Sequence, residues 1–354
     1  MANKLRIGII GAGSIATAHM HGFGQLQEDV ILDAVTDINL ELAKNRAKEF
    51  GVRRVIESSE ELLQDKSIDA VVIAVPNKWH APLAIQALQA GKHILLEKPM
   101  AINGEAAKEI RKAQKESGKI VMIPHQLRWQ ASALEVKKQV EDSSLGKIYY
   151  AKTTNLRRKG IPGWGSWFTQ KELSGGGPLI DIGVHMLDLT LWLMGNPKPV
   201  SVYGSTYAAF GPEKKGLGSW GTPNWNGTFD VEDLATALVK MDDGSTLSLE
   251  VSWAAHKDTD DTATVQLMGT EGGALLKGNT LRFYTEKFNQ PIDVDIPVLT
   301  EESERILLNK HFIECIREGK EPISSSLTGL TNNLIIDAIY ESSVTGKEVL
   351  INWD

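Results

Sequence analysis

A short apolar segment near the start of the chain runs into a glycine-rich turn, and this pairing constrains the fold more than any other feature. Residues 5–10 read LRIGII and residues 11–16 read GAGSIA, which places the pattern G-x-G-x-x-A between an expected strand and an expected helix. Gly11 permits a tight turn, and Gly13, which has no Cβ, lets a pyrophosphate approach the backbone. Ala16 is small enough for the helix to pack on the strand. The turn therefore predicts a dinucleotide-binding fold.

A second apolar segment helps to identify the cofactor. Residues 30–37 read VILDAVTD, and Asp37 follows the glycines at the spacing of about 20 residues at which an acid binds the adenosine ribose hydroxyls. The next residues, Ile38 and Asn39, supply no arginine for a 2′-phosphate, so we predict NAD rather than NADP. Because N–H groups at a helix start bind anions, the predicted cofactor contacts here are Gly11, Gly13, Ser14, Ile15 and Asp37.

Length and charge exclude several classes of protein. A chain of 354 residues favours two domains, each with its own core. With 38 basic and 45 acidic residues, a net charge of −7 and no basic run, the sequence argues against nucleic acid or an anionic membrane surface as a partner. We find no signal peptide and no apolar stretch of the roughly 18 residues that a membrane span requires. We therefore expect a cytoplasmic protein.

The sequence contains one cysteine, Cys315. A single cysteine excludes an internal disulfide and a cysteine-based zinc site. It lies at helical spacing among apolar residues in 311-HFIECIREG-319, so we expect an inert thiol in the core.

Expected strands and helices alternate through the first third of the sequence, a pattern that is typical of a parallel sheet with crossover helices. After the first two strands, further strands are expected at residues 69–75, 93–97 and 120–123. Six strands would complete a doubly wound sheet. We assign residues 1–124 to an NAD-binding Rossmann domain.

The remaining residues, 125–354, show a different pattern. We expect a helix near 131–140, a long strand at 147–157, a loop at 158–177 and one helix at 178–194. Alternating apolar and polar residues separated by turns then predict successive antiparallel strands, at 198–210, 234–241, 245–255 and 262–269. The result would be an α+β domain with a large, mostly antiparallel open sheet whose helices cover one face. The other face needs a partner, so we assign substrate binding and association into a homodimer or homotetramer to this domain.

Three loops leave the carboxyl ends of the expected parallel strands, where doubly wound sheets bind their ligands. The first is the glycine-rich turn. The other two contain Pro76, Asn77 and His80, and Glu97 with Lys98. We expect all five residues to border the cofactor and Lys98 to point toward its nicotinamide half. For His80, a histidine that bonds the backbone at a helix start is the alternative.

A second group of candidate residues lies on the expected helix 178–194. Asp181 and His185 are four residues apart and share one helix face, and Asp188 could extend the group. A histidine beside a carboxylate suits acid–base catalysis near neutral pH. A surface ion pair, a core histidine or an ion ligated by both residues are the alternatives, but no further ligand is evident and we expect no metal. Three preceding glycines, residues 175–177, would let the backbone approach a ligand.

Tryptophan and arginine gather in the loop 155-NLRRKGIPGWGSWF-168. Exposed tryptophans stack on sugar faces, and arginines bind hydroxyls or acids, but these tryptophans could equally cover a domain junction. Trp220 and Trp225 present a weaker form of the same pattern, and His19 and His21 are interpreted as packing or solvent-facing. Residues after the last strand of the first domain border the crevice, which completes the predicted substrate contacts Gln126, Arg128, Arg157, Trp164 and Trp167.

Together these segments resemble the glucose–fructose oxidoreductase, inositol dehydrogenase and MocA (Gfo/Idh/MocA) family over essentially the whole chain. The resemblance rests on GAGSIA at the N-terminus, Glu97-Lys98-Pro99, 175-GGGPLIDIGVHMLD-188, 267-LMGTEGGA-274 and 334-LIIDAIYESSVTGKEV-349. It implies a Rossmann domain joined to an open sheet through which subunits associate, and a cis peptide bond before Pro99.

The resemblance also implies catalytic roles for three residues. His185 would take the proton from a substrate hydroxyl, Asp181 would orient His185 and the substrate, and Lys98 would stabilise the developing alkoxide. A hydride would pass to the nicotinamide. These roles agree with the chemistry of the residues themselves, namely a base, an orienting carboxylate and a cation.

The leading hypothesis is therefore an NAD(P)-dependent oxidoreductase acting on CH–OH groups, with NAD as cofactor and a sugar or inositol-like cyclitol as substrate. An alternative is a redox-neutral glycosidase or sugar oxidoreductase that recycles its NAD. Accumulation of free NADH distinguishes the two. A third hypothesis, a regulatory protein that binds NAD(H) without catalysis, conflicts with the presence of Lys98, Asp181 and His185 together.

Overall fold

A computed structural model describes the chain except for residues 1–2, 261–262, 279 and 299–301. The chain divides into two compact units, each with its own sheet. The first unit comprises Met1–Gln126 and Glu301–Leu330, and the second comprises Leu127–Thr300 and Thr331–Asp354. The segment 301–330 therefore packs with the first unit, although it follows the second sheet in sequence. A functional division between residues 124 and 125 stays a prediction.

The first unit contains the predicted parallel sheet of six strands, and the structure shows their order to be β3-β2-β1-β4-β5-β6. Its strands pair only in parallel. They are β1 (Leu5–Ile10), β2 (Val30–Thr36), β3 (Arg54–Val55), β4 (Ala70–Ile73), β5 (His93–Leu96) and β6 (Val121–Met122). The apolar stretch 69–75 forms a shorter strand than predicted, because the chain has already left the sheet when it reaches Pro76.

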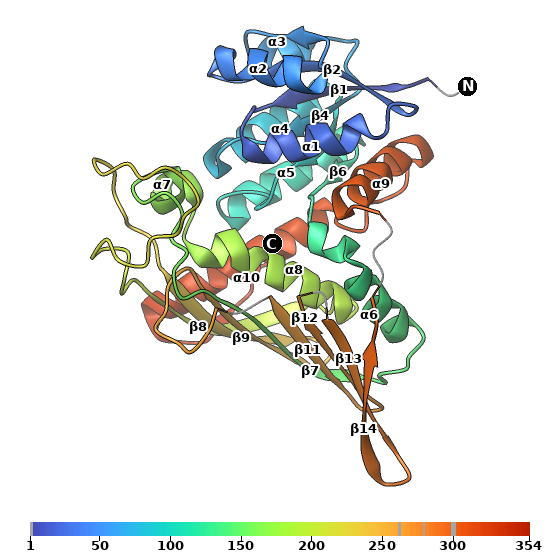
Figure 1. Cartoon of the computed structure of the whole chain (residues 1–354), viewed down its shortest axis with the longest axis vertical. Coiled ribbons are helices and arrows are strands. Elements are labelled where there is room, and N and C mark those ends of the chain that lie inside the picture. Colours follow the sequence, from blue (N-terminus) through green and yellow to red (C-terminus); the bar gives the residue numbers. More distant parts are fainter. Residues whose placement is uncertain (1–2, 261–262, 279, 299–301) are drawn as a thin grey trace. The chain divides into compact units, whose positions relative to one another are not determined.

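Six α-helices of this unit lie within the described residues. They are α1 (Ser14–Gly24), α2 (Leu40–Phe50), α3 (Ser59–Gln64), α4 (His80–Gln89), α5 (Gly104–Ser117) and α9 (Glu304–Glu318). Ser58 and Asn103 cap α3 and α5 by accepting the N–H groups of Glu61 and Ala106. Figure 1 shows helices on both faces of the sheet, which explains why the central strand β4 is buried along its whole length.

The segment 301–330 is joined to the first sheet by direct contacts. Ile123 donates its N–H to the carbonyl oxygen of Ser324 at 2.9 Å, beside an isolated β-bridge between Met122 of β6 and Ser325. Helix α9 packs on α1, where the Asn309 side chain donates to the backbone oxygen of His19 at 3.3 Å. Residues almost 300 positions apart in sequence thus stabilise the helix that follows the glycine-rich turn.

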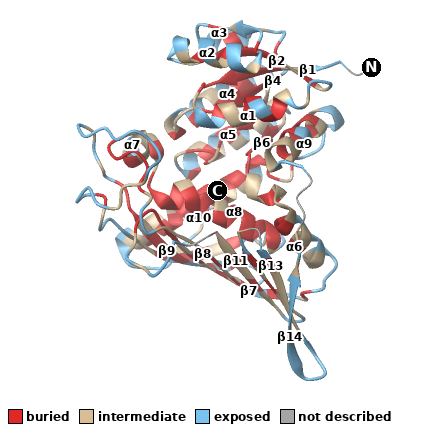
Figure 2. Cartoon of the chain, viewed as in Figure 1, coloured by how far each residue is buried: buried red, intermediate tan, exposed pale blue. Residues whose placement is uncertain are grey.

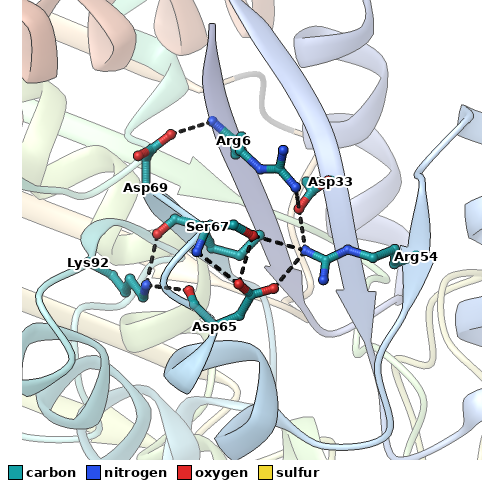
Figure 3. Close-up of polar contacts among 8 residues, drawn as sticks. Arg6, Asp33, Arg54, Asp65, Ser67, Asp69 and Lys92 are labelled. Carbon is teal, nitrogen blue, oxygen red and sulfur yellow. Dashed lines mark hydrogen bonds and ion pairs between the residues drawn. The ribbon is translucent and has the colours of Figure 1, made fainter. Parts of the chain in front are cut away.

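A network of charged residues joins the strands at the edge of this sheet that carries their amino ends (Figure 3). The buried carboxylate of Asp33 accepts hydrogen bonds from Arg6 and Arg54. Arg54 also pairs with Asp65 at 2.7 Å, and Lys92 donates to two backbone oxygens in the same loop. These groups bond one another on the side of the sheet away from the predicted cofactor loops, so we assign them a structural role.

The second unit contains a sheet of nine strands in the order β14-β13-β12-β11-β7-β10-β9-β8-β15. All neighbours pair antiparallel except β7 and β10, which confirms the predicted open, mostly antiparallel sheet. The strands are β7 (Ile148–Leu156), β8 (Pro199–Tyr207), β9 (Leu234–Met241), β10 (Thr246–Ser252), β11 (Thr264–Gly269), β12 (Gly273–Lys277), β13 (Thr280–Lys287), β14 (Gln290–Ile296) and β15 (Val349–Leu350). Residue 262, the expected start of β11, lies outside the described residues.

Helices cover one face of this sheet, as Figures 1 and 2 show. They are α6 (Ala131–Glu141), α8 (Val184–Leu193) and α10 (Ser326–Thr345). Helix α10 lies on β8, where the Ser342 hydroxyl accepts the N–H of Gly204 at 2.9 Å. On the other face, Tyr203 and Leu238 are exposed and opposite each other on β8 and β9. The prediction that helices cover a single face is confirmed.

The expected helix 178–194 begins differently from the prediction. Residues Leu179–Gly183 form a π-helical turn, and α8 starts only at Val184. The preceding segment is also not entirely a loop, because it contains the short helices η3 (Trp167–Thr169) and α7 (Lys171–Ser174). A π-helical turn is rare and occurs often at functional sites. Among the described residues, every helix is too short or too polar to cross a membrane.

Candidate active site

The glycine-rich turn of the first unit has the geometry of an anion-binding site. Gly11 has a φ of +99°, and a Cβ there would lie 2.2 Å from the backbone oxygen of Ala74, so only glycine fits. A Cβ on Gly13 would point into open space. Gly13 also precedes α1 without a capping side chain, and the first turn of α1, which includes the exposed Ser14 and Ile15, contains no acid. The first N–H groups of α1 can therefore bind a pyrophosphate.

Asp37 is held at the end of β2 by two backbone N–H groups. Its Oδ2 accepts the N–H of Ala12 at 2.7 Å, and its Oδ1 accepts the N–H of Asn39 at 2.8 Å. The carboxylate is thus fixed beside the glycine-rich turn and remains half-exposed, next to the exposed side chain of Ile38. This arrangement fits an acid that binds the ribose hydroxyls of a dinucleotide.

His80 joins the two loops that follow β4 and β5. Its Nδ1 lies 2.7 Å from the backbone oxygen of Pro99, and its Nε2 lies 2.9 Å from that of Val75. The ring is buried, and burial lowers its pKa. These contacts agree with the alternative in which His80 bonds the backbone. Of its neighbours, Asn77 is buried in the short helix η1 (Asn77–Trp79) and Pro76 is half-buried before it.

Glu97 forms a buried pair with His19. The burial of His19 agrees with its interpretation as a packing residue, and the ion pair is an additional contact that was not predicted. Oε1 of Glu97 lies 2.8 Å from Nε2 of His19 and 3.8 Å from Nη1 of Arg305, while Oε2 accepts the N–H of Lys98 at 3.1 Å. Burial acts to raise the pKa of Glu97, but the hydrogen bond and charge of His19, with the charges of Arg305 and Lys98, outweigh it and lower the pKa to about 2. An ionised carboxylate therefore anchors the loop that contains Lys98.

Lys98 itself is half-buried at the carboxyl end of β5. The Lys98–Pro99 peptide bond is cis, as the resemblance implies. The backbone of this segment is held on one side by Glu97 and on the other by His80. The first unit therefore contains the glycine-rich turn, Asp37 and Lys98 on loops at one edge of a single sheet.

In the second unit, Asp181 and His185 lie on either side of the change from the π-helical turn to α8. Both are half-exposed, although the residues between them are buried. Oδ2 of Asp181 accepts the indole N–H of Trp253 at 3.0 Å, and Trp253 is fully buried. This partner was not evident from the sequence, because Trp253 is one more apolar residue of an expected strand. The carboxylate of Asp181 is therefore held by the core of the unit.

Asp188, which could extend this group by its helical spacing, forms a buried ion pair with Arg128. It is buried and accepts two hydrogen bonds from Arg128, from Nε at 2.7 Å and from Nη2 at 2.6 Å. Asn332 of α10 donates to the same carboxylate at 3.3 Å, and the Arg128 guanidinium lies 5.5 Å from the centre of the Trp192 ring. This pair fixes the segment before α6 to α8 and α10. Substrate contacts by Arg128 and by Gln126 of η2 (Gln126–Trp129) stay predictions.

The tryptophans of the second unit differ in exposure. Trp164 is 6% exposed and donates its indole N–H to the backbone oxygen of Gly211 at 2.7 Å, while Trp167 is half-buried. Trp220 and Trp225, the weaker candidates, are the exposed ones at 55% and 54%. Arg157 is half-buried and donates its N–H to Ser252 at the end of β10. Contacts of these side chains with a substrate stay predictions.

The glycines before Asp181 approach other parts of the protein. A Cβ on Gly176 would lie 1.8 Å from the hydroxyl oxygen of Tyr340, and one on Gly177 would lie 2.1 Å from the backbone oxygen of Glu232. The structure thus gives these glycines a packing role in place of the expected approach to a ligand. Neither Glu232 nor Tyr340 was evident from the sequence, because they lie 55 and 164 residues further along the chain than Gly177 and Gly176.

Two smaller observations concern metals and the cysteine. Within the described residues, no cluster of three or more histidines, cysteines or acids is arranged to hold a metal ion. Cys315 is buried, and burial raises the pKa of its thiol to about 11. The predicted core position of Cys315 is thereby confirmed, and its inertness stays a prediction.

Two family models match the chain. A model described as an oxidoreductase family with an NAD-binding Rossmann fold matches residues 5–125, and the model of the GFO/IDH/MocA C-terminal domain matches residues 133–275. The two matches correspond to the parts of the chain that carry the parallel sheet and most of the second sheet.

Relatives of named activity match the chain over nearly its full length. It is 31% identical to D-glucoside 3-dehydrogenase of Escherichia coli (strain K12), over 98% of each protein. It is 28% identical to scyllo-inositol 2-dehydrogenase (NAD(+)) of Bacillus subtilis (strain 168), over 99% of this chain and 98% of the relative. The fold matches a levoglucosan dehydrogenase solved in complex with NADH and levoglucosan, with a TM-score of 0.88, 26% identity, and coverage of 99% and 100% of the two chains.

Proposed function

The chain belongs to the Gfo/Idh/MocA family of NAD-binding oxidoreductases, and we propose that it oxidises a secondary hydroxyl of a sugar or cyclitol with NAD. The observation that carries the proposal is the joint presence of a fitted cofactor site and a positioned lysine in the first unit, and of Asp181 and His185 in the second. The named activities of the relatives, on a glucoside, an inositol and levoglucosan, support this substrate class.

The residues of the first unit fit the cofactor. The open space at Gly13 and the uncapped start of α1 suit the pyrophosphate, and Asp37, already oriented by two N–H groups, suits a ribose that lacks a 2′-phosphate. Ser14, Ile15, Pro76 and Asn77 would contact NAD from the loops around this site. His80 and Glu97 would act on it through the backbone of the Lys98 loop, which they hold. Bound NAD would supply the acceptor for the hydride.

Each catalytic residue has a separate task in the proposed reaction. His185 takes the proton of the substrate hydroxyl, which leaves the oxygen negatively charged as the C–H bond breaks. Lys98 donates a hydrogen bond to that oxygen and stabilises the charge. Asp181, held by Trp253, orients the imidazole and stabilises it once it is protonated. In the reverse direction the same groups protonate the oxygen of a ketone.

The remaining proposed features concern the sugar pocket and the association of subunits. Gln126, Arg128, Arg157, Trp164 and Trp167 are the residues that we propose to shape the sugar pocket. Subunits would associate through the sheet face that bears Tyr203 and Leu238, because exposed aromatic and aliphatic residues on a broad sheet favour a protein partner. Sedimentation velocity distinguishes a dimer from a tetramer. The cytoplasmic location stays a prediction that cell fractionation can check.

The experiment that tests the catalytic assignment compares the wild type with Lys98→Met. Both proteins are titrated with NADH, and both are assayed with NAD and the best substrate of the wild type. We expect the variant to lose turnover by a factor of roughly 10² or more, as for other groups that stabilise a developing oxyanion, while NADH still binds. Turnover that survives in Lys98→Met would exclude Lys98 from the reaction.

A further inference from the structure

A buried carboxylate binds the start of the segment that carries Asp181 and His185. Glu232 lies just before β9 and is buried. Its Oε2 accepts the N–H of Gly177, and its Oε1 accepts the N–H of Leu179, both at 3.0 Å. The two oxygens of one side chain thus satisfy two backbone donors at the start of the π-helical turn, where N–H groups have no partner within the helix.

The sequence limits the number of backbone N–H groups that can bind Glu232 at this turn. Pro178, between the two bonded residues, has no N–H group. The backbone oxygen of Gly177 accepts the N–H of Asp181 at 3.0 Å. A single residue therefore separates the Glu232 carboxylate from the backbone of Asp181. Any shift of Gly177 moves Asp181 and, through the same turn, His185.

Tyr340 of α10 fixes the carboxylate from a second direction. Its hydroxyl donates to Oε1 of Glu232 at 3.0 Å. Because Gly176 and Gly177 have no Cβ, Tyr340 can lie close to Gly176 and Glu232 close to Gly177. Burial raises the pKa of Glu232, and the N–H groups of Gly177 and Leu179 act against that effect. A buried polar group is costly unless it is hydrogen-bonded, and the three donors satisfy the carboxyl group of Glu232.

We infer that Glu232 is a positioning residue for catalysis, which sets the orientation of Asp181 and His185 by holding the start of the helix that carries them. The inference rests on the proposed function, since it assigns Glu232 a role through those two residues. Together with Trp253, which holds the Asp181 carboxylate itself, Glu232 would fix both the backbone and the side chain of the orienting acid. A displacement of about 1 Å in such a group can reduce turnover about 10²-fold.

The test uses Glu232→Gln and Tyr340→Phe in the full chain. A glutamine offers one acceptor oxygen and one NH2 group, so one of the two backbone N–H groups would face a donor and the turn would move. Tyr340→Phe removes only the third bond and should have a smaller effect in the same direction. Asp33→Asn is the matched control, because it weakens a buried carboxylate network within the first unit, whereas α8 belongs to the second unit.

Two readouts separate positioning from a merely structural role. The first is steady-state kinetics, where we expect Glu232→Gln to lower kcat by roughly tenfold or more while NADH affinity stays within about twofold of the wild type. The second is the titration of His185 by NMR, with its signal assigned by its loss in His185→Asn. We expect the titration midpoint of His185 to move in Glu232→Gln and to remain in place in Asp33→Asn.

The outcomes distinguish the inference from the proposed function. Suppose that Glu232→Gln and Asp33→Asn both lower the melting temperature, but that Glu232→Gln changes neither kcat nor the titration midpoint of His185. The inference is then overturned, and Glu232 is structural only. If the wild type itself turns over no sugar or cyclitol, the proposed function fails. The His185 titration still decides in that case whether Glu232 positions the histidine.

Discussion

Oε1 of Glu97 lies 2.8 Å from Nε2 of His19, so the acidic residue next to Lys98 is bonded to the helix that starts at the glycine-rich turn. The loop that contains Lys98 is therefore joined directly to α1, the helix that would bind the pyrophosphate. Arg305 of α9 lies 3.8 Å from the same carboxylate oxygen. A segment from late in the sequence thereby contributes to the electrostatics of this pair.

The low pKa of Glu97 predicts how stability depends on pH. Because its pKa is about 2 in the folded protein and its ordinary value is 4.5, its ionised form stabilises the fold above about pH 4.5. That contribution is lost as the pH falls from 4.5 toward 2. We expect Glu97→Gln to unfold at lower urea concentration than the wild type at pH 7, and the difference to shrink toward pH 3. A difference that stays constant over this range would contradict the pairing.

Asp37 should govern the choice of cofactor. Asp37→Ala removes the acceptor for the ribose hydroxyls, and the loss of a hydrogen bond to a charged group costs about 1.5–3 kcal/mol, so we expect NAD to bind roughly 10- to 100-fold more weakly. NADP binding should change less, because its 2′-phosphate gains from removal of the negative charge. Asp37→Asn, which keeps an acceptor for Ala12 or Asn39, controls for disruption of the turn. An equal loss of NAD and NADP affinity would argue against the ribose contact.

His185 should be needed for turnover but not for cofactor binding. We expect His185→Ala to lower kcat by roughly 10²–10⁴-fold, the usual contribution of a general base, and to leave the dissociation constant of NADH unchanged. His21→Ala, at an exposed histidine of α1, is the control. The pH dependence of kcat should lose its acidic limb in the first variant, and an unchanged profile would remove His185 from the mechanism.

The charged network around Asp33 predicts a change in stability alone. Asp33 is 1% exposed, whereas Arg6 and Arg54, its two partners, reach the solvent. Solvent screening limits the value of such pairs, so we expect Asp33→Ala to reduce the free energy of unfolding by about 1–3 kcal/mol. Urea unfolding measures this loss, and kcat should stay at the wild-type value. A lower kcat under conditions where Asp33→Ala is fully folded would contradict this prediction, because it would show that the network affects the reaction.

The parts of the fold that follow from local patterns were predictable. Apolar runs, capping residues such as Asn103 and the glycine-rich turn predict the parallel sheet, and hairpin turns predict the middle of the second sheet. The hairpin of β13 and β14 was missed, because β14 is largely exposed and lacks the alternation of a half-buried strand. Strand β15 has two residues and no pattern to detect.

The site was predictable only as far as its motifs extend. Lys98, Asp181 and His185 were found from their positions next to expected strands, helices and glycines. The tertiary contacts around the site were not predicted, because each joins residues far apart in sequence: Glu97 with His19, Asp181 with Trp253, and Asp188 with Arg128. Helical spacing placed Asp188 beside His185, but tertiary packing directs it into a buried ion pair. The π-helical turn at Asp181 has no established signature in sequence.

The measurement that tests the central claim most directly is NADH absorbance with the wild-type protein, NAD or NADP, and a panel of glycosides, aldoses and inositols. We predict that NADH accumulates with NAD and a small subset of these polyols, and that NADP supports a much lower rate. If no NADH forms while chromatography shows that a glycoside is consumed, the protein recycles its cofactor and the proposed dehydrogenase reaction is contradicted. If neither NADH nor a product forms with any member of the panel, the assignment to sugar and cyclitol substrates is contradicted.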